Sequence, residues 1–266
     1  MNRLKKVFKK RLEAGQKLFL PYLCAGDPDL ATSRELVLTA DENGADVLEY
    51  GFPFSDPVAD GPTVQKAGLR SFDSGVSLKK VFATVSGLRS ETELPLVMMT
   101  YYNPVLKRGE DWFLEHSAEA GFDAILVVDL PPEEGLEFYQ RAADYELQTI
   151  LLATPTTHPE RVRELSRLAT GFIYYVMVTG VTGARTGYDT KLAERLQAAR
   201  EACEIPLVAG FGVSNYEMIA PYLDYVDGVV TGSALIQKIE DNLGAPDKIK
   251  SEVEQFVRNL AEPLHS

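Results

Sequence analysis

The 266-residue sequence contains few residues of the kinds that build disulfide, thiol or metal chemistry. It has two cysteines, Cys24 and Cys203, so far apart that we expect reduced thiols, no disulfide framework and a reducing compartment, the cytoplasm. No CxxC or Cys/His spacing occurs, and the sequence therefore predicts no metal site. The three histidines, His116, His158 and His265, fall in a predicted helix, at a helix start and in the C-terminal tail, which disfavours a histidine-based mechanism.

Long apolar runs and an excess of positive charge are also missing. No run of 18 apolar residues exists, and the basic N-terminal stretch lacks the apolar core of a signal peptide, so neither a membrane span nor a secretion signal is predicted. With 39 acidic and 27 basic residues the net charge is −12, which disfavours binding to nucleic acid or to anionic membranes. Taken alone, this charge also looks ill-suited to an anionic small molecule.

Eight short apolar runs recur along the chain, with helix-like stretches between them. Strands that are buried on both faces have this composition. Eight strands alternating with helices predict one (β/α)8 barrel domain over residues 1–266, and the alternative is a doubly wound sheet. The runs are Leu18–Cys24, Ala45–Tyr50, Leu94–Thr100, Asp123–Asp129, Thr149–Thr154, Phe172–Val178, Ile205–Gly210 and Val226–Thr231.

Helix starts and one long loop complete the predicted barrel. Ser77 precedes a stretch with apolar residues at helical spacing, and three capping-box patterns predict further helix starts. The 49 residues from the start of the second run to the start of the third exceed the other spacings, and the loop Gly51–Thr63 is predicted to take up the excess. The capping-box pairs are Thr32/Glu35, Thr157/Glu160 and Ser214/Glu217.

Functional residues of such a barrel follow the carboxyl ends of its strands. None of the segments that follow the predicted strands carries a lysine until Lys66, which already lies well inside a predicted helix. This disfavours a Schiff-base mechanism. Glu49 shares one strand face with Ala45 and Val47, so it is predicted to point into the barrel, where burial would raise its pKa and allow it to move protons. The alternative is an outward Glu49 that pairs with a basic residue of a helix.

Other candidate residues have an ordinary structural explanation as well. Asp60 and Asp56 lie in the long loop, where each could be catalytic or a simple turn residue. Glycines that follow the last three strands, with Ser233, could bind phosphate through backbone N–H groups at a helix N-terminus, or could form tight turns. Six apolar or aromatic residues near strand ends suit a flat aromatic ligand but could equally be barrel core: Tyr22, Met99, Tyr101, Leu126, Tyr174 and Phe211.

Together these motifs resemble the α subunit of tryptophan synthase. The most specific is the stretch from Leu48 to Pro62, LEYGFPFSDPVADGP. The resemblance spans the chain, with the shorter motifs in the right order: Gly26-Asp27-Pro28, Tyr101-Tyr102-Asn103-Pro104, Asp129-Leu130-Pro131, Thr179-Gly180-Val181-Thr182-Gly183 and Gly210-Phe211-Gly212.

The resemblance implies a retro-aldol cleavage of indole-3-glycerol phosphate to indole and glyceraldehyde 3-phosphate, without metal or cofactor. It implies that Glu49 is the acid/base and that Asp60 binds the indole N–H. The phosphate site would include Gly183, Gly212, Gly232 and Ser233, and Thr182 would also bind the substrate. The six apolar and aromatic residues would line the indole pocket or its approaches. Such a site needs no positively charged protein, so the net charge excludes nucleic acid but not a sugar phosphate.

The resemblance also implies a partner, a β subunit that carries pyridoxal phosphate, in an α2β2 heterotetramer. The rim residues Pro53, Asp56, Asn103, Pro104 and Pro131, with Pro132, are predicted to contact that subunit, and the alternative is simple loop rigidity. One departure is Met177, where the family usually has a serine. It puts one polar contact in doubt but not the reaction.

Three alternative functions stay open at this point. The main alternative enzyme is another phosphate-binding barrel, such as indoleglycerol-phosphate synthase or a sugar-phosphate isomerase, but the synthase would need a strand-end lysine. A regulatory subunit without catalysis would not need an intact Glu49 and Asp60. A sugar-binding module would not need an inward Glu49.

Overall fold

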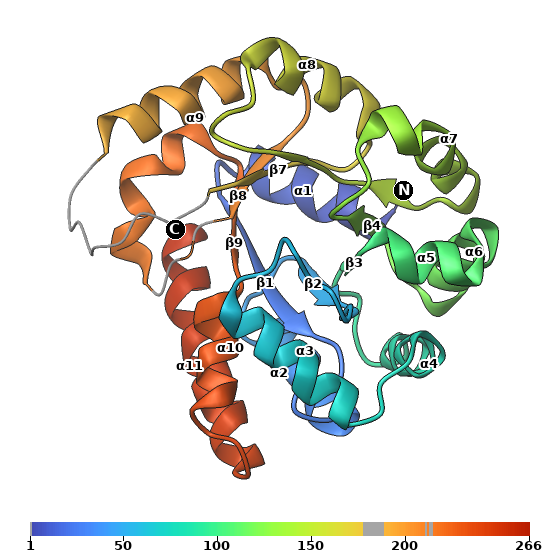
Figure 1. Cartoon of the computed structure of the whole chain (residues 1–266). Helices are drawn as coiled ribbons and strands as arrows, with labels where there is room; N and C mark the ends of the chain where they lie inside the picture. Colours follow the sequence, from blue (N-terminus) through green and yellow to red (C-terminus); the bar gives the residue numbers. More distant parts are fainter. Residues whose placement is uncertain (1, 178–188, 211, 213–214) are drawn as a thin grey trace.

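The protein folds as a nearly closed barrel of parallel strands surrounded by helices, which confirms the predicted fold (Figure 1). The computed structural model describes residues 2–177, 189–210, 212 and 215–266. Neighbouring strands follow the order β5-β4-β3-β2-β1-β9-β8-β7-β6. The strands are β1 (Leu18–Cys24), β2 (Leu48–Gly51), β3 (Leu96–Thr100), β4 (Ala124–Val127), β5 (Gln148–Thr149), β6 (Leu151–Ala153), β7 (Ile173–Val176), β8 (Leu207–Gly210) and β9 (Gly228–Thr231).

Each of the eight apolar runs contains a barrel strand. The fifth run differs in detail, because Ile150 separates β5 from β6 and thus divides one barrel position into two short strands. β5 pairs with β4, whereas β6 pairs with β7. This interrupted segment therefore joins the two ends of the sheet and completes the circle.

The helices follow the strands, as a barrel requires. Between β2 and β3 the chain forms two helices, α3 and α4, so the long spacing reflects an additional helix as well as a loop. Pro62 already begins α3, and the loop is therefore shorter than predicted. The helices are α1 (Arg3–Glu13), α2 (Leu30–Glu42), α3 (Pro62–Asp73), α4 (Leu78–Leu88), α5 (Tyr102–Arg108), α6 (Glu110–Ala120), α7 (Pro132–Ala142), α8 (Pro159–Leu168), α9 (Thr190–Ala202), α10 (Ser233–Glu240) and α11 (Pro246–Leu264), with short 3-10 helices η1 (Ala143–Tyr145), η2 (Tyr216–Met218) and η3 (Ala220–Tyr225).

The structure shows which of the predicted polar side chains cap the helix N-termini. Ser77 caps α4 as predicted, since its side chain accepts the N–H of Lys80. The capping box at Thr32 is wrong, because Asp29 caps α2 and accepts the N–H of Thr32 at 2.8 Å. The one at Thr157 is wrong too: α8 has no side-chain cap, and the Thr157 hydroxyl instead accepts the N–H of Thr154 within the preceding loop. Ser214 lies outside the described residues.

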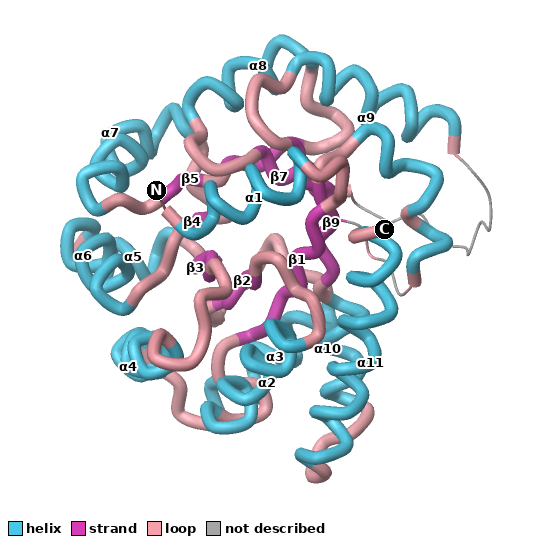
Figure 2. The backbone as a smooth tube through the Cα atoms, turned by 180° about the vertical axis from the view of Figure 1, so that it is seen from behind, coloured by secondary structure: helices cyan, strands magenta, loops and turns pink. Residues whose placement is uncertain are grey.

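The apolar core has an inner layer inside the barrel and an outer layer between strands and helices. Val47 belongs to the inner layer, as predicted, whereas Ala45 precedes β2 and packs in the outer layer. Helix α1 lies across one end of the barrel in the view from behind (Figure 2). Its Leu4 and Phe8 enter the inner layer, where the Phe8 ring stacks on Phe172 at 5.5 Å between centroids.

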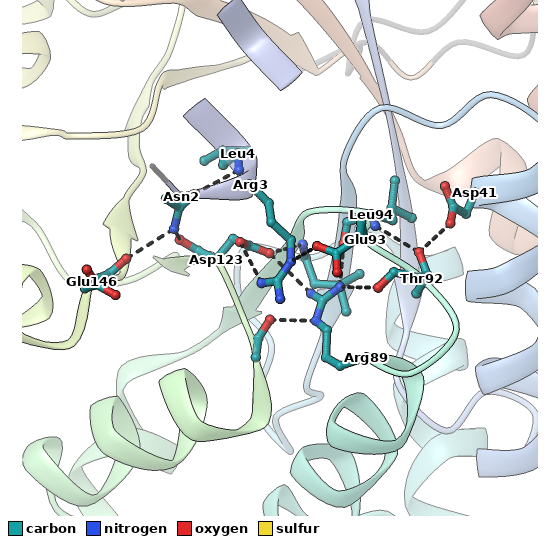
Figure 3. A network of polar contacts seen from close by, with 12 residues as sticks. Asn2, Arg3, Leu4, Asp41, Arg89, Thr92, Glu93, Leu94, Asp123 and Glu146 are labelled. Atoms are coloured by element: carbon teal, nitrogen blue, oxygen red, sulfur yellow. Dashed lines mark hydrogen bonds and ion pairs between the residues drawn. The ribbon is translucent and has the colours of Figure 1, made fainter. Parts of the chain in front are cut away.

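Buried carboxylates fasten α1 to the amino end of the barrel. Asp123, just before β4, accepts the N–H of Leu96 at 3.1 Å and pairs with Arg3 of α1 and with Arg89 (Figure 3). Asp46, just before β2, accepts the N–H of Phe19 at 2.9 Å and pairs with Arg11 at 2.6 Å. Both ends of α1 are therefore tied to the barrel, and the predicted functional residues lie at its opposite, carboxyl end.

Candidate active site

Glu49 points into the barrel from β2, as predicted. Its strand neighbours in register are Tyr22 on β1 and Val97 on β3, and only 1% of Glu49 is exposed. Its Oε1 has no hydrogen-bond partner among the described residues. Burial disfavours the charged form and raises the pKa of Glu49 to about 8. The outward orientation is excluded, and the carboxyl group carries a proton at neutral pH.

Asp60 lies in the loop between β2 and α3, at the edge of the same site. Partial burial raises its pKa to about 6, and a hydrogen bond from the Tyr101 hydroxyl opposes that rise. The same hydroxyl accepts the N–H of Ala59 at 3.0 Å, and the Tyr101 ring packs on Phe54. The tyrosine therefore holds the loop at both its backbone and its carboxylate. Asp56, by contrast, is exposed; its side chain accepts the Ser55 hydroxyl, and its carbonyl accepts the N–H of Val58.

A small pocket that Asp60 helps to line lies at this edge of the barrel. Among the predicted substrate residues it contains Tyr22, Met99 and Tyr101, and the charges of Asp60 and Glu49 both act on the buried Tyr22 hydroxyl. Glu49 is not among the lining residues. Most residues that line the pocket were not predicted from the sequence, although they lie near β1, β3 and the loop motif, which could have indicated them. These residues are Cys24, Phe52, Phe54, Pro57, Val64, Gln65, Gly68, Thr100 and Val128.

Two glycines make room for two tyrosine hydroxyls inside the barrel. A side chain at Gly51 would place its Cβ 2.4 Å from the Tyr22 hydroxyl, and one at Gly210 would place it 2.6 Å from the Tyr174 hydroxyl. Burial raises the pKa of the Tyr174 phenol, and the nearby charge of Glu49 adds to that rise. Leu126 is buried in the inner core layer and does not line the pocket.

A helix N-terminus opens at the predicted phosphate site. Gly232 precedes α10 and Ser233 is its first residue, with no side-chain cap and no acidic residue in the first turn. Backbone N–H groups at such a terminus attract an anion. Gly212 is exposed, whereas Thr182, Gly183 and Phe211 lie outside the described residues. The helix start is thus where the sequence predicted it, and phosphate binding stays a prediction.

The predicted rim residues differ in their exposure. Asp56, Asn103 and Pro131 are exposed and Pro104 is half-buried, whereas Pro132 is buried at the first turn of α7. Pro53 is also buried, close to Gly68 of α3. The first four can therefore meet a partner directly.

Met177 is buried in the outer core layer, and its N–H bonds to the carbonyl of Gly210 at 3.2 Å. An apolar side chain is thus well accommodated at this departure from the family pattern.

No group of His, Cys, Asp and Glu side chains able to hold a metal ion occurs in the described part of the chain. Within the same residues, no helix has both the length and the apolar character needed to cross a membrane.

A parallel (β/α)8 barrel with a buried neutral acid, a nearby ionisable aspartate and an uncapped helix N-terminus defines a barrel enzyme of the acid–base type. The chain matches the family described as tryptophan synthase alpha chain over residues 8–265. It is 46% identical to the tryptophan synthase alpha chain of Geobacter sp. strain M21 over 92% of both chains. The crystal structure of the alpha subunit from Legionella pneumophila strain Paris has a TM-score of 0.91 at 32% identity and covers 99% of this chain and 98% of its own.

A chain from the tryptophan synthase a2b2 complex of Pyrococcus furiosus has a TM-score of 0.86 at 36% identity, covering 92% of this chain and 98% of its own. The protein described here belongs to the tryptophan synthase alpha chain family. It is a carbon–carbon lyase of tryptophan biosynthesis, and its reaction is the cleavage of indole-3-glycerol phosphate to indole and glyceraldehyde 3-phosphate.

Proposed function

We propose that Glu49 and Asp60 carry out this cleavage, with Glu49 as the proton shuttle and Asp60 as the group that binds the indole N–H. The observation that supports the proposal is the different environment of the two groups: Glu49 is enclosed with no partner for its Oε1, whereas Asp60 is less buried and receives the Tyr101 hydroxyl. With a pKa of about 8, Glu49 is neutral at pH 7, whereas Asp60, with a pKa of about 6, is charged. One carboxyl group can therefore donate a proton while the other stabilises positive charge.

The reaction balances with these two groups. Glu49 gives its proton to C3 of the indole ring, and positive charge develops toward the ring nitrogen, where the Asp60 carboxylate stabilises it. The Glu49 carboxylate then takes the proton of the glycerol hydroxyl next to the ring. The carbon–carbon bond breaks, its electron pair returns to the ring, and the hydroxyl oxygen becomes the aldehyde of glyceraldehyde 3-phosphate. Glu49 ends protonated, as it began.

The substrate would span two subsites. We place the indole ring in the pocket beside Tyr22, Met99 and Tyr101, with Leu126, Tyr174 and Phe211 around its approaches. The phosphate would bind the backbone N–H groups at the start of α10. Gly183, Gly212, Gly232 and Ser233 are the proposed phosphate residues, with Thr182 as a further substrate contact, and the uncapped first turn of α10 supports this placement.

We propose that the chain forms a single domain that uses no metal or cofactor of its own. In this proposal pyridoxal phosphate belongs to the partner β subunit. The location we propose is the cytoplasm, on the ground that both cysteines are free and buried.

We further propose that this chain joins a β subunit in an α2β2 assembly, as the Pyrococcus furiosus complex does. Two exposed apolar side chains near the predicted rim residues support a docking surface there. Val58, in the loop that carries Asp60, is 88% exposed, and Leu106 of α5 is 59% exposed. Apolar side chains this exposed are typical of a surface that a partner covers.

The proposal is tested with Glu49→Gln and Asp60→Asn, by measuring indole release from indole-3-glycerol phosphate. We expect Glu49→Gln to lose at least about 1000-fold in kcat and Asp60→Asn about 100-fold, with phosphate affinity kept in both. An Asp60→Asn enzyme with normal kcat would remove Asp60 from the mechanism. An inactive wild type that still stimulates a β subunit would instead support the regulatory alternative.

A further inference from the structure

A network of ion pairs joins three segments around the candidate site. Arg70 of α3 donates two hydrogen bonds to Asp27, in the turn after β1, at 2.6 Å from Nε and 2.9 Å from Nη2. The same guanidinium reaches Glu240, the last residue of α10, at 3.4 Å, and Lys66 binds the other oxygen of Glu240 at 2.7 Å. The Asp27 side chain is fully buried, so a buried carboxylate anchors Arg70 through a bidentate contact.

Helix α3 determines where Asp60 lies. The helix begins at Pro62, two residues after Asp60, and the Gln65 side chain donates to the Asp60 carbonyl at 2.8 Å. Ser71 and Ser74, near the other end of the helix, donate to carbonyls of the turn after β1 at 2.5 and 3.0 Å. Movement of α3 relative to that turn would therefore move the Asp60 loop.

Helix α10 determines where the phosphate end of the substrate lies. Its first residue is Ser233 and its last is Glu240, so the ion pairs hold the end opposite the proposed phosphate site. A regular helix of two turns is stiff over its length of about 12 Å. Holding Glu240 thus restrains the N–H groups at the start of the helix.

We propose that Asp27, Arg70 and Glu240, with Lys66, are positioning residues that fix the distance between Asp60 and the N-terminus of α10. The inference rests on the proposed function, in which one substrate occupies both places. A ligand that spans two subsites benefits from both only when their spacing matches its length. The network would then affect the whole substrate and spare ligands that occupy one subsite.

Glu240→Ala is the informative variant, because it removes both ion pairs between α3 and α10 while Asp27 keeps its buried cation. We expect kcat/KM for indole-3-glycerol phosphate to fall about tenfold, since misplacement of one subsite weakens a spanning substrate. The dissociation constants of indole alone and of inorganic phosphate alone should change less than about twofold. Both constants are measured by calorimetry on the folded variant.

Two further variants test the same idea. Lys238→Ala is the matched control: it removes a single ion pair from α10, that with Glu252 of α11 at 3.0 Å, and should behave as wild type. Arg70→Lys keeps a cation for Asp27, but a lysine cannot bridge Asp27 and Glu240 at once. Because Lys66 still pairs with Glu240, we expect the Glu240→Ala pattern with a smaller loss.

Two results would overturn the inference. One is normal kcat/KM for Glu240→Ala, and the other is a loss of indole or phosphate binding as large as the loss for the whole substrate. A wild type that fails to cleave indole-3-glycerol phosphate would instead refute the proposed function, so the two failures are distinguishable.

Discussion

Glu49 and Asp60 are both carboxylic acids, and their different surroundings give them different pKa values. Glu49 lies inside the barrel with no described partner for its Oε1, so desolvation alone raises its pKa to about 8. Asp60 is less deeply buried and receives the Tyr101 hydroxyl, which keeps its pKa near 6. The pair can therefore hold one proton at pH 7 without direct contact between the two groups.

This separation predicts a bell-shaped dependence of kcat/KM on pH. Activity should fall below about pH 6, where Asp60 becomes neutral, and above about pH 8, where Glu49 loses its proton. The measurement is kcat/KM for indole-3-glycerol phosphate from pH 5 to pH 9.5. Tyr101→Phe removes the bond that lowers the pKa of Asp60, so it should move the acid limb to higher pH. Activity that keeps rising beyond pH 9 would contradict the assignment of Glu49.

The burial of Glu49 should also lower the free energy of unfolding at neutral and higher pH. Below about pH 4.5 Glu49 is protonated in both the folded and the unfolded chain, whereas between about 4.5 and 8 only the unfolded chain ionises. The free energy of unfolding therefore decreases over this range as pH rises. Glu49→Gln removes the effect and should be more stable at pH 8 by on the order of 4 kcal/mol. Urea unfolding at pH 4 and pH 8 measures the gain, and an equal gain at both values would contradict it.

At the scale of elements, the strands were predictable, whereas the capping residue was predictable at α4 but not at α2 or α8. A strand buried on both faces must be apolar along its length, so the eight runs mark the barrel without knowledge of its contacts. A capping residue is decided by backbone geometry, and several short polar side chains compete near each start. At α2 the aspartate at 29 caps, although Thr32 and Glu35 form the sequence pattern. Of the two helices between β2 and β3, α4 was predicted from Ser77 and the apolar spacing that follows it.

The cap of α2 can be tested directly. Asp29→Ala removes the acceptor for the N–H and the hydroxyl of Thr32, at 2.8 and 2.7 Å, and should lower the free energy of unfolding by about 1 kcal/mol. Thr32→Ala leaves the backbone bond in place and should cost less. Thermal or urea unfolding of the two variants compares them, and a larger loss for Thr32→Ala would restore the capping box.

At the scale of the whole molecule, closure of the barrel decides which site residues can be predicted from the sequence. The alternation of one strand predicts that Glu49 points inward, whereas Asp60 was ambiguous until the resemblance was considered. Tyr101 and Asp60 meet only because β3 and the loop after β2 are neighbours in the barrel. The contact of Arg70 with Asp27 spans 43 positions and has no local pattern. Such pairs follow from closure of the barrel and cannot be read from spacing.

The proposed partner surface leads to a prediction at the same scale. Leu106→Glu places a charge on the exposed rim and should weaken β-subunit binding at least tenfold, while the activity of the isolated chain stays unchanged. Leu168→Glu is the control, since Leu168 is 40% exposed at the end of α8, just before β7, on the opposite end of the barrel. Equal binding by wild type and Leu106→Glu, measured by titration with the β subunit, would place the docking surface elsewhere.

Helix α1 affects where the substrate can enter the barrel and where the products can leave it. Its Leu4 and Phe8 fill the amino end of the barrel, and ion pairs of Arg3 and Arg11 keep them there. Among the described residues, α1 thus closes the amino end of the barrel and leaves the carboxyl end for the substrate and both products of the proposed site. A partner bound at the carboxyl end, as proposed above, would lie on the exit path of indole without contact to Glu49 or Asp60.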